Sequence, residues 1–387
     1  MKKLLLLISI GFYLNGTAQI NVMLNIPPRI QWPNNDGYCG ENSIQMCGLY
    51  YGNYISEGLC RTVAGGELLI YVNDTTALNA FSFTYNEWDP NAGTPQYAAY
   101  LDWVKQYLHN NKPVIITMYV SGMTDPDYDH IVPAIGFKAA AVNTYSGNDS
   151  LTFNSNFDTV PFTRVFSTLY ATRAMAGNSA PYEYYIPKDV DYGVAVTGNK
   201  DPARITRPVH IVLDSNDEPN VSLGVTARML RAAITADSLT PGLSYALLRY
   251  NNYLTVPSIN FNPAGASSVV YFTATATSKT VVDSFMSDSA VFYRCIPYSL
   301  SNIATPVNAD AVSCIIYPNP CTDYFSIETS YIAKQILSLF DIDGKLVLTK
   351  SICGKTIIDA RNLKEGIYML SITTNDSIIN KKLVIVH

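Results

Sequence analysis

Residues 114–137, VIITMYVSGMTDPDYDHIVPAIGF, place a short apolar segment on each side of a polar loop. The segments 114–119 and 131–137 are rich in β-branched residues and are as short as strands usually are. Residues 151–153 repeat the pattern after a second polar stretch. The three segments therefore predict the sheet of the first folded domain.

Two helical segments precede these strands. Apolar residues recur with helical spacing from Ile44 to Tyr51 and again over residues 97–110, where Leu101 and Val104 share one face. Helices that come first and a sheet that follows favour an α+β domain over residues 19–170.

Residues 171–300 have a different character, because helical periodicity fades. Turn-rich sequence separates short alternating segments, which predicts an all-β, sandwich-like middle domain. A short helix is also expected over residues 228–236. The strand candidates are residues 209–213, 245–250, 269–274 and 291–295.

Residues 1–18 have the order of features found in a secretory signal peptide. Lys2 and Lys3 precede a short apolar run, and small residues end at Ala18, where we expect cleavage. The run is too short to span a bilayer, which takes about 20 apolar residues. No later stretch is long and apolar enough to do so, and the mature chain is expected to have no transmembrane segment.

The C-terminal part of the chain predicts a separate module. Residues 301–313 are mostly Ser, Asn, Ala, Thr, Pro and Asp and predict a linker. Residues 314–387 then alternate in short β segments, with a hairpin signal at Asp343-Gly344, and predict a small β-sandwich. Its strand candidates are residues 314–317, 325–327, 335–341, 346–349, 357–359, 366–373 and 381–386.

Composition excludes some classes of partner. The net charge is −5 and no basic stripe is present, which argues against nucleic-acid binding. The seven cysteines include no pair with the C-x-x-C spacing typical of zinc sites. An exported chain can form disulfides, and the odd count leaves at least one thiol unpaired if the others bridge. We expect no metal and no organic cofactor.

Cys39 is the candidate nucleophile. A reactive cysteine needs a depressed pKa, a histidine within hydrogen-bond reach and a third group that orients that histidine. Cys39 follows a polar turn that ends at Gly37-Tyr38, and Gly40 permits a backbone or a substrate to come close. A helix that begins here supplies N–H groups that stabilise a thiolate. The alternative is a half-cystine or a buried core thiol.

His130 is the candidate base among four histidines. His387 is terminal, His210 stands in a strand of the middle domain, and His109 lies near a helix end, where a cation suits the helix dipole. His130 opens the strand 131–137, so that a rigid element holds its imidazole. The alternative is a loop histidine that happens to precede a strand.

The orienting group is expected after the next strand. Asn154, Asn156 and Asp158 follow residue 153, and we rank them in that order. Each of them alone is more often a turn residue. The order of cysteine, histidine and then amide or carboxylate is what favours thiol chemistry.

This order carries a resemblance. Residues 37–41 (GYCGE), residues 129–137 (DHIVPAIGF) and the Asn154 cluster resemble the papain-like cysteine peptidases, in particular the bacteriocin-leader-processing branch. The resemblance covers residues 25–170 and implies a papain-like α+β domain. The roles that it implies are nucleophile for Cys39, base for His130, orienting residue for Asn154 or Asn156, and oxyanion-hole donor for Gln31.

The C-terminal module carries a second resemblance. Residues 317–320 (YPNP), 339–345 (LFDIDGK), 363–368 (LKEGIY) and 381–385 (KKLVI) resemble the C-terminal sorting domain of type IX secretion cargo. The resemblance implies that the type IX secretion machinery is a partner. It also implies passage through the periplasm and across the outer membrane, followed by release or surface attachment. The alternative is an ordinary small β-sandwich used for adhesion.

Two functions are consistent with these observations. The first is a secreted thiol hydrolase, most simply a peptidase with a peptide or protein substrate, in which His130 deprotonates Cys39 and an acyl-enzyme forms. The second is a non-catalytic surface binding or adhesion protein on a papain-like scaffold. A disulfide at Cys39, or a large distance from His130, would exclude the first.

Overall fold

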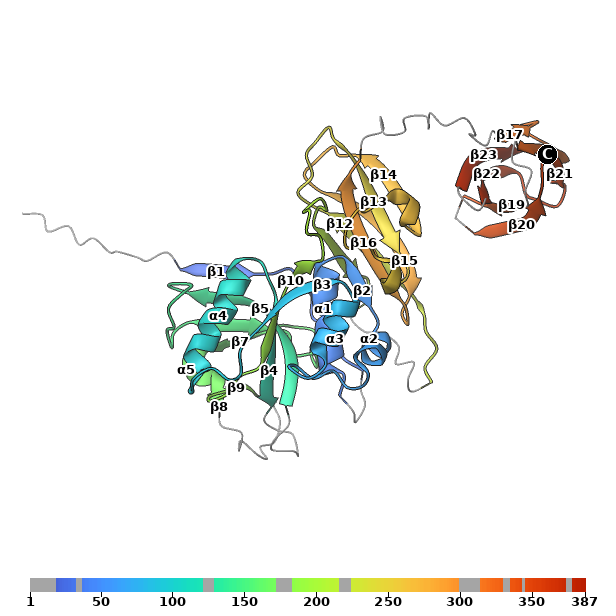
Figure 1. Cartoon of the computed structure of the whole chain (residues 1–387). Coiled ribbons are helices and arrows are strands. Elements are labelled where there is room, and N and C mark those ends of the chain that lie inside the picture. The colour runs from blue at the N-terminus through green and yellow to red at the C-terminus, as the bar shows by residue number, and fades with distance from the viewer. Residues whose placement is uncertain are drawn as a thin grey trace, which may run out of the picture. The chain divides into compact units, whose positions relative to one another are not determined.

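The computed structural model describes residues 19–32, 37–120, 129–171, 183–215, 224–298, 314–329, 335–342, 345–373 and 378–387. They belong to two compact units, Met1–Leu300 and Ser301–His387 (Figure 1), each of which is described by itself. The predicted signal peptide, residues 1–18, and the predicted linker, residues 301–313, lie outside the described residues. The described chain is mostly β-structure, arranged in several sheets.

The first unit contains a nine-stranded sheet. Six strands follow one another in the order β3-β10-β4-β5-β6-β7, β1 pairs with β5, and β9 pairs with β4 and β8. All pairs are antiparallel except β8 with β9. The strands are β1 (Ile20–Met23), β3 (Phe83–Glu87), β4 (Val114–Val120), β5 (Asp129–Ala139), β6 (Ser150–Phe153), β7 (Phe162–Val165), β8 (Tyr170–Ala171), β9 (Tyr184–Pro187) and β10 (Gly193–Asn199).

Helices cover both faces of this sheet (Figure 1). Val114 and Ile116 of β4 pack in the core that contains α4, whereas Ile115 packs in the core that contains α2 and α3. A strand buried on both faces is apolar at nearly every position, which is why residues 114–120 are apolar apart from Thr117. No helix in the described ranges is long and apolar enough to cross a membrane. The helices are α1 (Cys39–Tyr50), α2 (Glu57–Ala64), α3 (Asp74–Ala80), α4 (Tyr97–His109) and α5 (Phe166–Leu169).

Helix α1 is buried on every side. All residues from 39 to 49 are buried. Met46 packs in the core with α4, Cys47 in the core with α2 and α3, and Leu49 in the core of the β-sandwich that follows. The three cores of the first unit therefore meet at α1, whose first residue is Cys39.

Two further sheets of the first unit form this sandwich. Their strand orders are β11-β12-β15 and β14-β13-β16-β2, and their facing side chains share one apolar core. The four strand candidates of the middle region correspond to β11, β13, β14 and β16. The strands are β2 (Asn53–Ile55), β11 (Val209–Leu213), β12 (Met229–Ala236), β13 (Ser244–Tyr250), β14 (Ser268–Thr273), β15 (Lys279–Met286) and β16 (Ala290–Pro297).

The two parts of the first unit exchange strands. β9 and β10 return to the nine-stranded sheet, and β2, directly after α1, pairs with β16 in the sandwich. The boundary expected at residue 170 therefore cuts through the first sheet. The helix expected over residues 228–236 is wrong, because these residues form β12. Leu230, Ala232 and Ile234 are buried in alternation, the period of a strand, and this burial outweighs the helix propensity of the alanines.

The second unit is a small β-sandwich, as predicted. A three-stranded sheet, β17-β18-β21, and a four-stranded sheet, β20-β19-β22-β23, enclose one apolar core. Each of the seven strand candidates corresponds to a strand. These are β17 (Cys314–Tyr317), β18 (Tyr324–Thr329), β19 (Gln335–Phe340), β20 (Leu346–Ile352), β21 (Thr356–Asp359), β22 (Gly366–Thr373) and β23 (Ile378–Ile385).

Candidate active site

The chain turns sharply into α1 at Cys39. Gly37 has a φ of 55°, in the left-handed region that glycine adopts without strain. Arg61 of α2 holds this turn, because its guanidinium donates to the Gly37 carbonyl and lies 3.5 Å from the centroid of the Tyr38 ring. Its Nε also pairs with Glu41 Oε1 at 2.7 Å. The start of α1 is thus fixed by an ion pair as well as by packing.

The thiol of Cys39 is free and only 6% exposed. Burial raises its pKa to about 12, and the charges of Glu41 and Glu67 act in the same direction. The main-chain N–H groups of Ile131 and Gly40 favour the thiolate and lower the pKa in part. The depressed pKa required of a nucleophile is therefore not what this environment produces, because desolvation outweighs the helix N-terminus.

His130 is fully buried at the start of β5. Its Nε2 lies 2.6 Å from the Ser155 carbonyl oxygen, which can only accept, so Nε2 carries the proton and Nδ1 the basic lone pair. The Phe157 ring stacks on the imidazole with centroids 4.4 Å apart. Burial lowers the pKa of His130 to about 4, although the bond to Ser155 opposes this. The imidazole is neutral at pH 7.

Asn156 and Ser43 join the start of α1 to the start of β5. Asn156 Nδ2 donates to the main-chain carbonyls of Cys39 and Ile131, both at 2.9 Å. Ser43 Oγ, one turn along α1, lies 2.7 and 3.0 Å from the same two carbonyl oxygens, and its one hydrogen donates to either of them. Asn156 has a φ of 64°, which asparagine tolerates better than most residues. The side chains of Asn156 and Ser43, called the clamp from here on, hold the start of α1 at Cys39 beside the strand that carries His130.

The two asparagines do not have the predicted orienting role. Asn154 Nδ2 donates to the Ile26 carbonyl at 3.0 Å, and the Asn156 amide is engaged in the clamp. Within the described residues, neither side-chain amide is hydrogen-bonded to the His130 ring. The Ser155 carbonyl, between them in sequence, is the partner of the ring instead. Every residue has a main-chain carbonyl, so the sequence could not have indicated this partner of the ring.

Gln31 and Asp158 differ in their relation to the site. The main-chain N–H of Gln31 donates to the Asn156 carbonyl at 2.9 Å, and the Gln31 side chain is buried beside the clamp. Asp158 is exposed and accepts from the Thr159 N–H, so it takes no part. Ser43 was missed in the sequence, although its position four residues after Cys39 places it on the same helix face. No set of three or more His, Cys, Asp or Glu side chains in the described ranges is arranged to hold a metal ion.

Comparison with known proteins identifies the second unit. Residues 315–386 match the family model of the secretion system C-terminal sorting domain. No curated protein matches the chain. The C-terminal sandwich is therefore a type IX secretion sorting domain, which implies interaction with that machinery and a cell-surface or extracellular destination.

Proposed function

We propose that the protein is a secreted thiol hydrolase, and specifically a papain-like cysteine peptidase, with Cys39 as nucleophile and His130 as base. One observation carries the proposal. Asn156 Nδ2 donates at 2.9 Å to the main-chain carbonyls of both Cys39, the first residue of the central helix, and Ile131, the residue that follows His130. The fold thus brings a thiol and an imidazole-bearing strand together from distant parts of the sequence.

The protonation state of His130 supports its role as base. With Nε2–H donated to Ser155, Nδ1 is the atom that takes the proton of the Cys39 thiol. The thiolate then attacks a peptide carbonyl, the amine leaves with the proton, and water hydrolyses the acyl-enzyme. The N–H groups at the start of α1 favour negative charge at the sulfur and at a developing oxyanion.

A second candidate is a non-catalytic surface binding protein on the same scaffold. The observation that favours it is the burial of both reactive groups, which raises the pKa of Cys39 and lowers that of His130. Both shifts favour the neutral pair, and a neutral thiol is a poor nucleophile. On this reading Cys39 and the clamp are parts of the core.

Iodoacetamide labelling of the full mature chain at pH 7, measured by peptide mass spectrometry, distinguishes the thiol hydrolase from the binding protein. Cys47 is the matched internal control, because it lies on the same helix and burial alone raises its pKa. Cys353 is exposed and reports unhindered labelling. We expect Cys39 to react at least about tenfold faster than Cys47, and His130→Ala to slow Cys39 alone.

A proposed peptidase must also cleave peptides. We expect the wild type to hydrolyse members of a fluorogenic peptide library and Cys39→Ala to be inactive, while Cys47→Ala keeps its activity. Labelling of Cys39 as slow as that of Cys47, unchanged by His130→Ala and without peptide cleavage, would overturn the hydrolase and leave the binding protein.

A further inference from the structure

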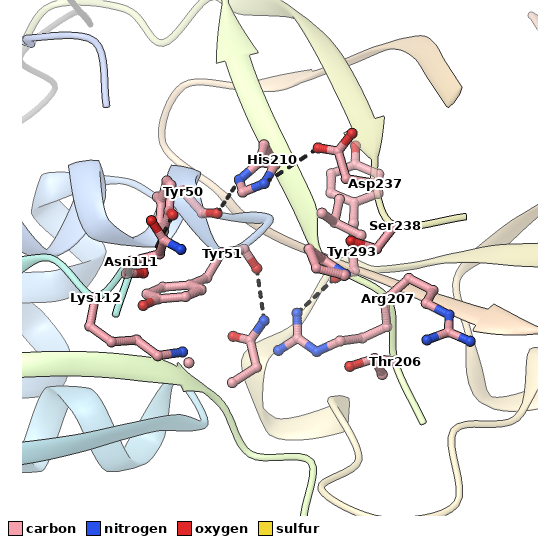
Figure 2. Close-up of a pocket in the computed structure, with 15 residues that line it drawn as sticks. Tyr50, Tyr51, Asn111, Lys112, Thr206, Arg207, His210, Asp237, Ser238 and Tyr293 are labelled. Carbon is pink, nitrogen blue, oxygen red and sulfur yellow. Dashed lines mark hydrogen bonds and ion pairs between the residues drawn. The ribbon is translucent and has the colours of Figure 1, made fainter. Parts of the chain in front are cut away.

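A pocket of about 380 Å³ lies at the other end of α1 from Cys39. Tyr50 and Tyr51, at the end of the helix, line it together with Lys112 and residues of the sandwich (Figure 2). Tyr50 lies eleven positions after Cys39 on the helix, a rise of about 17 Å at 1.5 Å per residue. The pocket is therefore separate from the candidate active site. Its size suits a small ligand.

A buried guanidinium lines this pocket. Arg294 of β16 is 1% exposed, and its Nη1 donates to Asn53 Oδ1 at 2.7 Å and to the Tyr293 carbonyl at 2.8 Å. Nε and Nη2 have no hydrogen-bond partner within the described part of the chain, and neither atom is exposed, so a ligand reaches them only when a neighbouring side chain moves aside. These two atoms form the edge of the guanidinium that binds a carboxylate in bidentate fashion. An unsatisfied buried charge of this kind is costly and calls for a partner.

The nearby carboxylates do not satisfy Arg294. Asp201 acts on it through its charge, but its Oδ2 accepts from both the N–H and the hydroxyl of Thr206. Asp237 is 3.5 Å from His210 Nε2, on the side of the pocket opposite Thr206 (Figure 2). Burial lowers the pKa of Arg294 to about 10, which fits a cation with incomplete compensation.

Further cations line this pocket and its neighbour. A second pocket shares Lys112, Asn199 and Thr206 with the first and therefore adjoins it. Among the described lining residues of the two pockets are five cations and two carboxylates, although the whole chain has a net charge of −5. The cations are Lys112, Lys200, Arg204, Arg207 and Arg294, and the carboxylates are Asp201 and Asp237.

We propose that this pocket binds a small ligand through a carboxylate group held by Arg294. Lys112 at the rim supplies the attraction that draws the anion in, and the Tyr51 ring beside it offers an apolar wall. The same chemistry occurs in an acidic sugar and in the C-terminus of a peptide. The site is independent of Cys39.

Isothermal titration of the full mature chain at low ionic strength tests the proposal with two carboxylates and their neutral counterparts. The probes are D-glucuronate against D-glucose, and N-acetyl-alanine against its amide. We expect one carboxylate to bind with a Kd below about 1 mM and neither neutral compound to bind. Binding of D-glucuronate indicates an acidic sugar as the ligand, and binding of N-acetyl-alanine indicates the C-terminus of a peptide. Cys39→Ala should leave the affinity unchanged, whatever the outcome for thiol hydrolysis.

Variants assign the binding to Arg294. Arg294→Met should weaken the binding at least about tenfold, the value of one charge-assisted hydrogen bond. If that variant does not fold, the rim double variant Lys112→Gln/Arg207→Gln replaces it, and a tenfold loss is again expected. Lys138→Gln, an exposed lysine on β5, removes one charge and is the control for Arg294→Met, and Lys138→Gln/Lys188→Gln, at two exposed lysines, is the control for the double variant. Absence of saturable binding by both carboxylates, or equal affinity in the control and in the folded pocket variant, would overturn the proposal.

Discussion

The clamp between α1 and β5 gives a prediction of measurable size. Asn156→Ala removes the Nδ2 donor shared by the Cys39 and Ile131 carbonyls. Ser43 Oγ stays 2.7 and 3.0 Å from these two oxygens and donates its one hydrogen to either of them, and we expect a loss of about 1–3 kcal/mol for the hydrogen bonds. Alanine at a φ of 64° adds about 1 kcal/mol of backbone strain.

Asn156→Gly is the matched variant, because it removes the same amide but relieves the strain. Its greater unfolded-state entropy offsets part of this relief, so we expect it to be milder than Asn156→Ala by roughly 0.5–1 kcal/mol. Urea unfolding followed by tryptophan fluorescence measures both. The chain has three tryptophans, Trp32, Trp88 and Trp103, and all lie in the first unit, so the signal reports that unit alone.

Two results would refute this reasoning. Unfolding free energies of both variants within about 0.5 kcal/mol of the wild type would mean that the amide does not join the two elements. A glycine variant less stable than the alanine variant would mean that residue 156 is not held in the left-handed region.

Three further predictions concern protonation and export. Burial lowers the pKa of His130 to about 4, so the folded state binds this proton more weakly than the unfolded state does. The free energy of unfolding is therefore highest above pH 6.5, and we expect it to fall by up to about 3 kcal/mol as the pH drops through 4. Urea titrations from pH 4 to 7 should show the fall, and a His130→Gln variant with the same slope would contradict it. Burial raises the pKa of Asp191 to about 8. The folded state therefore binds this proton more tightly than the unfolded state does, and the stabilisation that results is present below pH 3.8 and is lost as the pH rises through 8. Asp191→Asn should therefore stabilise the first unit by at least about 2 kcal/mol at pH 8 and by little at pH 4, and equal effects at both would exclude this. Deletion of residues 315–386 should leave the protein inside the cell envelope of its native host, as measured by fractionation, whereas secretion without them would show that the sorting domain is dispensable.

The periodicity of apolar residues in short segments was sufficient to predict many of the strands and helices. Every strand of the C-terminal sandwich was predicted, because a short β pattern, such as the alternation of buried and more exposed residues in β19, is a property of neighbours in sequence. The strands β4, β5 and β6 were predicted from short apolar runs rich in β-branched residues, and the helices α1 and α4 from the helical spacing of their apolar residues. Gly40 was expected to permit a close approach, and a side chain there would lie 2.4 Å from the Leu68 carbonyl oxygen.

Other features are decided by contacts between distant residues. β2 pairs with the sandwich, and residues 229–236 form a strand, because of the surface that each segment covers in the folded protein. A short stretch of sequence does not indicate which surface that is. The partner of His130 is a carbonyl, which every residue possesses. The pocket around Arg294 gathers residues from 50 to 294, whose charges are unremarkable when read singly.

The sequence by itself determined the periodic strands, the export module and the order of Cys39, His130 and the asparagines. Only the tertiary structure decided that Cys39 and His130 are buried, that their pKa values move away from the charged pair, and that Asn156 positions the backbone and does not orient the ring. The physical reason is that periodicity is a property of adjacent residues. Desolvation is a sum over everything that surrounds a group in space, and no spacing along the chain encodes it.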